Sequence, residues 1–427
     1  MSATGITLDV VRELGAICGQ ENARERPIGG VYVSPSCAEE VAAVLALANE
    51  RHLSVGPAGG STERSAAEAH VEILLHTNRL TQVEHYDHAD LTVGVGAGTT
   101  IAQLNAMVGA DRLLFAADPP FPERCTVGGL LATAMHGPLR HGYGAVRDFC
   151  IGVRFVTGDG RRAKGGGRVV KNVAGYDLMK LLIGSYGTLA VITSASFKLF
   201  PAPRQTRTFL AEFHTAKEAL AFRDRVVRSP LSPMCLELVS PGARRLMRPQ
   251  MTDDAWVMCL RAGGSDAVLA RYRKDLGAAV TRELEGDSEH RMWRAIEDFP
   301  QSTDGVGYGN GDDNESQLID LTVWPRDVAA VVDALLDTTA IGEPDVALVG
   351  RAGIGHLRVL ARGRNAAARD MSTAIIAAVR GKLGDNFAVK AAGAANPWPI
   401  APSSLAEMRA VKQALDPKNI LGGRDIF

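Results

Sequence analysis

The stretch from Thr126 to Ile192 constrains the fold of this chain more than any other. It opens with TVGGLLATAMHGPLRHGYGAVRDF, continues through GGGRVVKNVAGYDLMKLLIGSYGTLAVIT, and alternates dense glycine with apolar runs. Glycine has no Cβ atom, so it permits positive φ angles and a close approach between backbone and ligand. Within the stretch, Asp177 to Ile183 predicts a short helix ended by Gly184, and Thr188 to Phe200 predicts a strand. The pattern favours a fold that holds a large, flat, phosphate-bearing cofactor.

Two glycine turns are candidate phosphate sites. The first, PAGGST at Pro57 to Thr62, follows a predicted strand. Its successive glycines would let backbone N–H groups point to one side, and its hydroxyls add donors suited to a pyrophosphate. The second, TVGG at Thr126 to Gly129, begins a small-residue turn or helix that could lie against phosphates. Either could be an ordinary turn, but their occurrence together favours backbone amides from both meeting at one dinucleotide.

A βαβ unit leads into the first turn. The sequence predicts a strand from Val31, a helix from Ser36 and a second strand from Leu53. Ser36 with Glu39 predicts a capping box at the start of the helix. The helical spacing predicts that one apolar face is buried, formed by Val41, Val44, Leu45 and Ala48.

The segment LTVGVGAGTTIAQL, Leu91 to Leu104, offers an alternative interpretation as a nicotinamide-binding turn between a strand and a helix. After Gly94 and Gly96 that fingerprint requires Gly or Ala where Thr99 stands, and no acidic strand end follows. We therefore expect Thr99 or Thr100 to cap a helix instead.

Composition excludes several classes of function. The 47 basic and 48 acidic residues give a formal net charge of −1, so no electrostatic case exists for nucleic acid or an anionic membrane. The six cysteines are scattered without a CxxC motif, which argues against iron–sulfur and structural zinc sites and indicates reduced thiols in the cytoplasm. No apolar run approaches the roughly 18 residues of a membrane span, so we expect no direct membrane insertion. His85 and His88 flank Asp87 in a predicted strand edge, and no metal site is expected there.

The two glycine turns, the VKNVAGYDLMKLLIGSYGTLAVIT segment and LDPKNIL at Leu415 to Leu421 closely resemble the FAD-linked oxidases of the vanillyl-alcohol oxidase and p-cresol methylhydroxylase (PCMH) superfamily. The GPLR, VRDF and GGRVVKNVAGYDL segments look most like the FAD-binding E subunit of bacterial glycolate oxidase. The resemblance is strong over residues 27–203, recurs at 396–427 and is faint between them.

This resemblance implies an α+β fold, with a two-lobed PCMH-type FAD-binding domain and an antiparallel-sheet cap of two ferredoxin-like repeats. We expect an N-terminal helical segment at 1–26, the FAD domain at 27–203 with lobes near 27–90 and 91–203, the cap or substrate domain at 204–395, and a C-terminal segment at 396–427 that returns to the FAD domain. The order of strands and helices after Pro203 also fits two βαββαβ units with helices on one face. The glycine-rich acidic stretch 300–316 predicts a disordered connection, with a lid or partner loop as the alternative.

The resemblance also implies which residues contact FAD. Relatives that bond FAD covalently often carry a histidine at the end of the first turn, where this chain has Ser61-Thr62-Glu63, so we expect non-covalent binding. The expected contacts are Pro57, Ala58, Gly59, Gly60, Ser61, Thr62, Pro120, Thr126, Val127, Gly128, Gly129, Ala132, Thr133, Gly187 and Val191.

Catalytic candidates come from the predicted strand GHLRVLAR. Oxidation of a 2-hydroxy acid needs a base for the hydroxyl proton and cations for the carboxylate. His356 and Arg358 lie two residues apart, so one strand face would carry both, as base and clamp. The alternative is a solvated face where both are incidental. Many relatives carry an HGHxGDGN-type segment, sometimes with a metal. The lone His356 in AGIGHLRV departs from it, which removes the case for a metal and weakens the case for independent catalysis.

We therefore expect an FAD-dependent oxidoreductase subunit, similar to the E subunit of glycolate oxidase, that takes part in oxidising glycolate or D-lactate and passes electrons to a partner. The resemblance implies a second FAD subunit and an iron–sulfur subunit as partners, and a cytoplasmic location, free or peripheral at the inner membrane through them. A self-sufficient FAD oxidase or dehydrogenase for another alcohol or hydroxy acid, and a noncatalytic flavin-fold scaffold, are the alternatives.

Overall fold

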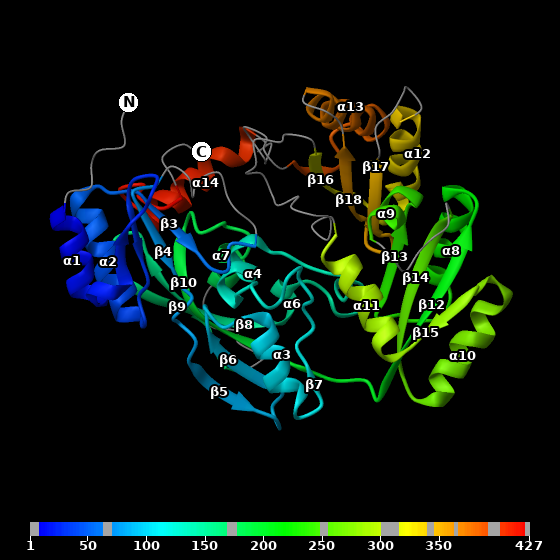
Figure 1. The fold of residues 1–427 in the computed structure, drawn as a ribbon, viewed down its shortest axis with the longest axis horizontal. Coiled ribbons are helices and arrows are strands. Elements are labelled where there is room, and N and C mark those ends of the chain that lie inside the picture. The colour runs from blue at the N-terminus through cyan, green and yellow to red at the C-terminus, as the bar shows by residue number, and fades with distance from the viewer. Residues whose placement is uncertain are drawn as a thin grey trace. The chain divides into compact units, whose positions relative to one another are not determined.

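The computed structural model describes residues 8–62, 71–168, 177–247, 255–299, 316–339, 346–362, 366–391 and 402–422. The chain forms two compact units (Figure 1). Unit 1 comprises residues 1–136, 144–202 and 400–427, and unit 2 comprises 137–143 and 203–399. The breaks lie within a few residues of the boundaries expected after 203 and 395, whereas the assignment of 137–143 to unit 2 was not anticipated. The stretch 300–315 lies outside the described residues.

The first sheet of unit 1 has four strands in the order β1-β2-β4-β3. Strands β2, β4 and β3 are parallel, and β1 is antiparallel to β2. Their bounds are β1 Ala23–Glu25, β2 Val31–Val33, β3 Val55–Ala58 and β4 Ile73–His76, with helices α1 Leu8–Cys18 and α2 Ala38–Arg51 beside them. The four residues predicted for the buried face of α2 are buried, which confirms that prediction.

The start of α2 corrects one prediction. The backbone N–H and the hydroxyl of Ser36 bond to the carboxylate of Glu40, at 2.7 and 3.0 Å, and not to Glu39. The helix begins one residue later than a capping box on Ser36 requires, with Cys37 at its N-cap. Glu39 is thereby turned outward, where it contacts Arg162.

The second sheet of unit 1 is antiparallel, in the order β5-β6-β10-β8-β9. Its strands are β5 Val83–Asp87, β6 Thr92–Gly96, β8 Cys150–Thr157, β9 Arg162–Gly166 and β10 Ala190–Lys198. Helices α3 Ile101–Gly109, α4 Val127–Thr133, α6 Val146–Phe149 and α7 Leu178–Leu182 contribute to its core. Thr100 caps α3 in a capping box with Gln103, as predicted. Because β5 pairs here, the second lobe begins several residues before the expected position 91.

The C-terminal segment completes unit 1. Helix α14, Pro402–Leu415, is followed by a turn in which Leu421 bridges to Val55 of β3. The ammonium of the buried Lys412 donates to the carboxylate of Asp416 at 2.6 Å, to the carbonyl of Thr188 at 2.6 Å and to the carbonyl of Leu421 at 2.9 Å. These bonds join the end of the chain to both sheets, as the expected return to the FAD domain requires.

Unit 2 contains one eight-stranded antiparallel sheet in the order β15-β12-β14-β13-β17-β18-β16-β19. Its strands are β12 Gln205–Phe213, β13 Cys235–Val239, β14 Trp256–Gly264, β15 Arg282–Leu284, β16 Ser316–Thr322, β17 Val346–Arg351, β18 His356–Arg362 and β19 Ala388–Ala391. Its main helices are α8 Ala216–Arg228, α10 Asp266–Leu276, α12 Val328–Thr339 and α13 Ala366–Leu383. Each half has the βαββαβ order, and the prediction of two ferredoxin-like repeats is confirmed.

The two faces of this sheet differ in character. One face and the four main helices share an apolar core that includes Phe209, Leu238, Met258 and Val359. Because side chains alternate along a strand, the neighbouring positions point to the opposite face. That face carries buried polar groups, which include Glu237, Arg351, His356 and Arg358. The predicted catalytic residues His356 and Arg358 are therefore on this polar face.

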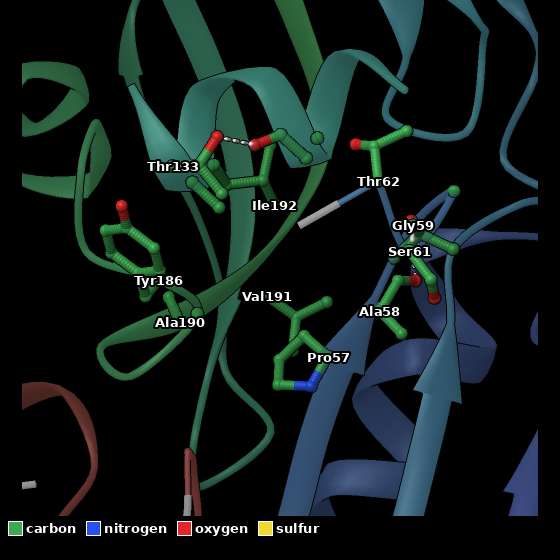
Figure 2. Close-up of a pocket in the computed structure, with 16 residues that line it drawn as sticks. Pro57, Ala58, Gly59, Ser61, Thr62, Thr133, Tyr186, Ala190, Val191 and Ile192 are labelled. Carbon is green, nitrogen blue, oxygen red and sulfur yellow. Dashed lines mark hydrogen bonds between the residues drawn. The ribbon is translucent and has the colours of Figure 1, made fainter. Parts of the chain in front are cut away.

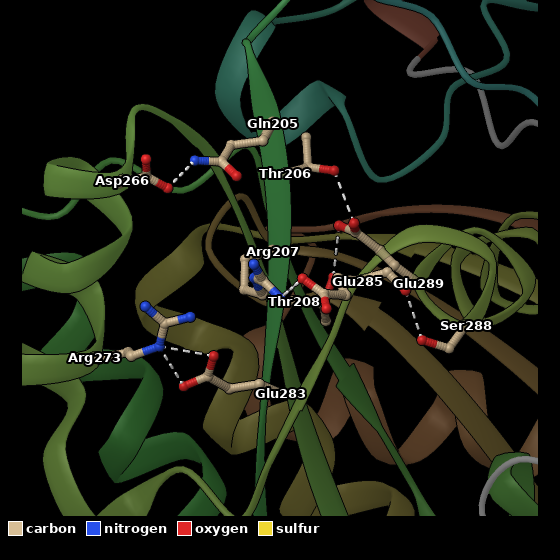
Figure 3. Close-up of polar contacts among 10 residues, drawn as sticks. All are labelled: Gln205, Thr206, Arg207, Thr208, Asp266, Arg273, Glu283, Glu285, Ser288 and Glu289. Atoms are coloured by element: carbon tan, nitrogen blue, oxygen red, sulfur yellow. Dashed lines mark hydrogen bonds and ion pairs between the residues drawn. The ribbon is translucent and has the colours of Figure 1, made fainter.

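Helix α11, Gly286–Glu297, packs against β12 through a buried carboxylate (Figure 3). Glu289 accepts hydrogen bonds from the hydroxyls of Thr206 at 2.7 Å and Thr208 at 2.9 Å, and from the Nε of Arg261 at 2.9 Å. The indole N–H of Trp293 donates to Thr208 at 2.8 Å. Helix α11, which lies in sequence between the two repeats, is therefore anchored by a buried carboxylate whose hydrogen bonds are satisfied.

Candidate functional site

The C-terminal end of β3, helix α4 and the turn before β10 surround a pocket in unit 1 (Figure 2). It brings together twelve of the fifteen expected FAD contacts, namely Pro57, Ala58, Gly59, Gly60, Ser61, Thr62, Gly128, Gly129, Ala132, Thr133, Gly187 and Val191. It is also lined by Thr77, Tyr186, Ala190 and Ile192, which sequence reasoning missed. Their strand and turn positions beside expected contacts were the only signal that could have found them.

The two glycine turns meet because they lack side chains. A Cβ atom on Gly60 would lie 1.6 Å from the carbonyl oxygen of Arg124, and one on Gly59 would lie 2.2 Å from the hydroxyl oxygen of Thr126. Real Cβ atoms essentially never approach another heavy atom within 3.0 Å. Segments more than 60 residues apart in sequence therefore come together only with glycine at these positions.

The first turn presents unused hydrogen-bond donors. Within the described residues, the backbone N–H groups of Gly59, Gly60, Ser61 and Thr62 donate to no acceptor. Ser61 has a φ angle of 50°, in the left-handed region that non-glycine residues seldom adopt. Successive amides with such a change of backbone hand form a concave nest that binds anions. This turn can therefore hold a phosphate through its main chain.

The second turn works differently from what the sequence suggested. The N–H of Val127 donates to the carbonyl of Thr99 at 2.9 Å, and the N–H of Gly128 donates to the carbonyl of Ala97 at 2.7 Å. The N–H of Gly129 donates to the hydroxyl of Thr126 at 3.2 Å. These amides are already used, so the expectation that both turns donate amides to one dinucleotide is wrong for this turn. Its contribution is a wall that a ligand can approach closely.

Three expected contacts do not line the pocket. Val127 is completely buried in the core of the second sheet. Thr126 caps α4 and lies beneath Gly59. Pro120 is buried and is not among the lining residues. Val127 and Thr126 therefore help to position the glycines of the pocket without lining it themselves.

The opposite wall is largely apolar. Gly187 has a φ angle of 73°, and a Cβ there would lie 3.0 Å from Cγ of Pro57. The N–H of Tyr186 donates to the carbonyl of Ala132 at 2.8 Å, which fixes this turn against α4. Val191 and Ile192 continue the wall into β10. A polar anion nest facing an apolar wall suits a ligand with both phosphates and flat rings.

None of the described residues that line the pocket is a histidine or a cysteine. Cys125 lies next in sequence to the second turn, but its thiol is buried and it hydrogen-bonds with Thr62. Burial raises the pKa of this thiol to about 12, so it is protonated at neutral pH. A protonated thiol is a poor nucleophile.

The expected catalytic pair lies in unit 2 on the polar sheet face. His356 and Arg358 are both only 6% exposed, so the alternative of a solvated strand face is wrong. The Nε of Arg358 donates to the carboxylate of Asp320 at 2.9 Å, and one of its terminal nitrogens donates to the carbonyl of Phe299 at 3.0 Å. These bonds hold Arg358 in a fixed position.

His356 is held in a defined protonation state. Its Nδ1 lies 3.1 Å from a terminal nitrogen of Arg351. A guanidinium only donates, so Nδ1 must be the acceptor and the imidazole proton must reside on Nε2. Burial, followed by the charges of Arg351, Arg358 and Arg140, lowers the pKa of His356 well below its usual value. The ring is therefore neutral and offers an N–H donor rather than a free basic nitrogen at Nδ1.

Two residues around His356 were missed by sequence reasoning. Arg351 pairs with His356 across β17 and β18, and its Nε donates to the carbonyl of Gly137 at 2.8 Å. Arg140, from the segment 137–143, is close enough for its charge to affect His356, and it is only partly buried. That segment is held on unit 2 by the N–H of Gly142, which donates to the carbonyl of Met234 at 3.0 Å. Arg140 ends the GPLR segment that carried the family resemblance, but nothing in the sequence indicated that it lies near His356. No group of three His, Cys, Asp or Glu among the described residues could hold a metal.

Comparison with known families decides the assignment. Residues 30–166 match the FAD binding domain family, and residues 202–425, more than half of the chain, match the C-terminal domain of FAD linked oxidases. The chain belongs to the FAD-linked oxidase family. FAD is the cofactor of this FAD-linked oxidase, and the expected superfamily resemblance is confirmed.

Curated relatives support the same conclusion over part of their length. This FAD-linked oxidase is 38% identical over 232 residues to a D-lactate dehydrogenase of Archaeoglobus fulgidus, covering 53% of this chain and 51% of the relative. It is 38% identical over 140 residues to the glycolate oxidase subunit GlcE of Escherichia coli K12, covering 33% of this chain and 40% of the relative. The matches thus span about half, or less, of these two proteins.

A solved structure supports the fold alone. p-Cresol methylhydroxylase with substrate bound superimposes with a TM-score of 0.72 at 15% identity, covering 98% of this chain and 97% of that structure. No helix in the described part of this FAD-linked oxidase combines the length and apolar character needed to cross a membrane.

Proposed function

We propose that this chain is an FAD-dependent oxidoreductase subunit that binds FAD non-covalently, takes part in oxidising a 2-hydroxy acid such as glycolate or D-lactate, and passes the electrons to a partner. The observation that carries the proposal is the pocket of unit 1, which is lined by an apolar wall and by four residues whose backbone N–H groups have no acceptor within the described part of the chain. FAD is the cofactor of this family, so we assign FAD as the ligand of this pocket.

Different residues of the pocket would bind different parts of FAD. The amides of Gly59 to Thr62 would bind the pyrophosphate, because an anion nest is most useful where negative charge is concentrated. Gly128 and Gly129 would let the cofactor approach α4 without a side chain between them. Val191 and Ile192 would shield a ring system from water. Bound FAD would supply the hydride acceptor of the reaction.

The polar face of unit 2 would bind the substrate. A 2-hydroxy acid loses a hydride from its α-carbon and a proton from its hydroxyl group, and becomes a 2-oxo acid. Arg140 is the partly exposed cation beside His356, so we place the carboxylate there, with the Nε2–H of His356 as a second donor. The hydroxyl proton would pass to Nδ1 of His356, the predicted base, which requires the hydrogen bond from Arg351 to break first.

Relatives support dependence on a partner. The Escherichia coli protein is named as a subunit of glycolate oxidase, and we propose that this chain likewise works with a second FAD subunit and an iron–sulfur subunit. The six cysteines are free thiols, which fits the cytoplasm as the location. A self-sufficient D-lactate dehydrogenase is the second candidate, because the Archaeoglobus relative carries that name.

Purification of the chain alone tests the proposal. We expect a yellow protein whose flavin is released into the supernatant by acid precipitation, because neither a histidine nor a cysteine is among the described residues that line the pocket. Anaerobic glycolate or D-lactate should bleach the flavin only when the partner subunits are present. Bleaching of the isolated chain would favour the self-sufficient enzyme, and a colourless protein that cannot be reconstituted with FAD would favour the scaffold.

A charge-removing variant tests the substrate site. In the assembled enzyme Arg140→Gln should raise KM for the 2-hydroxy acid by about tenfold or more, since a charge-assisted hydrogen bond is worth about 1.5–3 kcal/mol. Arg147→Gln is the matched control, because Arg147 is an exposed arginine seven residues further along the chain. Equal KM values for the two variants would remove Arg140 from the site.

A further inference from the structure

A second hollow lies on the five-stranded sheet of unit 1 and shares no lining residue with the candidate FAD pocket. It encloses about 230 Å³ between β8, β9 and β10. A water molecule occupies about 30 Å³ in the liquid, so the hollow has room for several waters or one small molecule. Its charged and hydroxyl-bearing lining residues are Glu84, Arg154, Lys164, Arg168, Ser194 and Ser196.

The strand register places like charges together at this hollow. Arg154 on β8 is directly opposite Lys164 on β9, so both side chains project from the same face. Like charges in such a pair destabilise a sheet unless something compensates them. Arg154 has one carboxylate partner, with Nε 3.2 Å from Glu84. Lys164 and Arg168 are exposed, and neither forms an ion pair within the described residues. The hollow therefore carries three cations for one carboxylate.

The floor of the hollow offers small groups and hydroxyls. Gly152 on β8 pairs with Gly166 on β9 and with Ser196 on β10, and Arg154 pairs with Ser194. A Cβ on Gly152 would lie 2.7 Å from the carbonyl oxygen of Gly167, and one on Gly166 would lie 2.2 Å from that of Ile151, so this part of the floor is closely packed main chain. Ser194 and Ser196 on β10 add two hydroxyl groups to the lining of the hollow. Both can donate to a ligand that occupies the hollow.

A histidine at the edge of the hollow also lacks a partner. The ring of His85 lies over Gly94, where a Cβ would be 2.3 Å from its Cε1 and 3.1 Å from the hydroxyl oxygen of Ser196. Neither ring nitrogen has a hydrogen-bond partner in the described part of the chain. A neutral imidazole always carries one N–H donor, and burying it unpaired is costly. An acceptor placed over Ser196 would reduce that cost.

We propose that this hollow is a binding site for a small dianion, of the size of a phosphate group or a short dicarboxylate. Lys164, Arg168 and Arg154 supply the charge, and the hydroxyls of Ser194 and Ser196 donate to the oxygens. One dianion would compensate the excess of two positive charges that remains after Glu84 is counted. The site is independent of FAD and of the hydroxy acid proposed above.

Isothermal titration calorimetry on the FAD-loaded protein tests the site, because bound FAD excludes phosphate from the first pocket. Titration with inorganic phosphate at constant ionic strength should give saturable binding of one equivalent. Lys164→Met and Arg168→Gln should each weaken it by about tenfold, the value of one charge-assisted hydrogen bond. Lys217→Met, at an exposed position of α8 in unit 2, should bind as the wild type does.

Retained flavin absorbance shows that each variant is folded. A parallel titration with succinate distinguishes the two kinds of dianion. A site selective only for charge and size should bind both anions, whereas a site selective for tetrahedral oxyanions should bind phosphate only. Absence of saturable heat with both anions would overturn the proposal. So would phosphate binding that is unchanged in both hollow variants.

Discussion

Gly60→Ala should separate the two glycine turns and weaken FAD binding. The added Cβ would lie 1.6 Å from the carbonyl oxygen of Arg124 and 2.5 Å from its carbonyl carbon. These are backbone atoms, so no side-chain rotation can relieve the clash, and the turns must move apart by roughly 1.4 Å to reach the 3.0 Å limit. Gly60 has no positive φ angle that would add strain of its own. The effect therefore reports contact between the turns.

The expected magnitude follows from the cost of overpacking, which is about 1–3 kcal/mol for a shift of this kind. If that free energy is lost from the bound state, the dissociation constant for FAD rises by a factor of about 5 to 150. Titration of the apoprotein with FAD, followed by quenching of flavin fluorescence, measures it directly. The first turn would lose the alignment of its amides with a phosphate.

Gly109→Ala is the matched control. Gly109 ends α3, and no heavy atom lies within 4 Å of the Cβ it would gain. Its FAD affinity should equal that of the wild type, and its Tm should be equal or slightly higher, because alanine favours a helix over glycine by about 1 kcal/mol. If Gly60→Ala bound FAD as tightly as this control does, the two turns would not be in contact and the pocket geometry would be refuted.

Three further substitutions test other parts of the structure. Lys412→Met should lower the free energy of unfolding by about 3–5 kcal/mol in urea, because it leaves the carboxylate of Asp416 buried without its cation; wild-type stability would contradict the buried pair. Glu289→Gln should cost about 1–3 kcal/mol, because an amide nitrogen cannot accept from the donors around it, and near-ultraviolet circular dichroism of Trp293 should change with it. His356→Gln should make the free energy of unfolding depend less on pH below about pH 6.5. The folded state keeps this ring neutral, whereas the unfolded chain takes up a proton below about pH 6.5, so the wild type loses up to about 1.4 kcal/mol per pH unit there; parallel profiles for wild type and variant would refute the lowered pKa.

Local patterns predicted the elements well. The 3.6-residue spacing identified the buried face of α2, and the alternation of strands and helices after residue 203 identified both repeats of unit 2. The first glycine turn was predictable because a nest requires only residues adjacent in sequence. Each of these features depends on short-range chemistry that a single chain segment displays.

The remaining features depend on long-range register. The amides of the second turn are taken by carbonyls of Ala97 and Thr99, which lie about 30 residues earlier in sequence, and no local signal marks that pairing. The partner of His356 is fixed by the register of β17 on β18, which brings Arg351 opposite it. Burial of that face likewise follows from tertiary packing. Sequence pattern alone therefore identified His356 as a candidate but gave neither its environment nor its protonation state.

Unit 1 is assembled from three stretches of the chain, with nearly all of unit 2 inserted before the last one. The final stretch is part of the packed structure of unit 1. Leu421 forms a β-bridge to the edge strand β3, and Lys412 donates hydrogen bonds to both Thr188 and Asp416. During synthesis, the ribosome must therefore translate the whole cap before the flavin-binding unit can close. The cap has the opposite advantage, because its two repeats are nearly continuous in sequence and can fold while translation proceeds. A fragment ending at residue 202 would lack this closing segment, so flavin uptake should be among the last events in maturation.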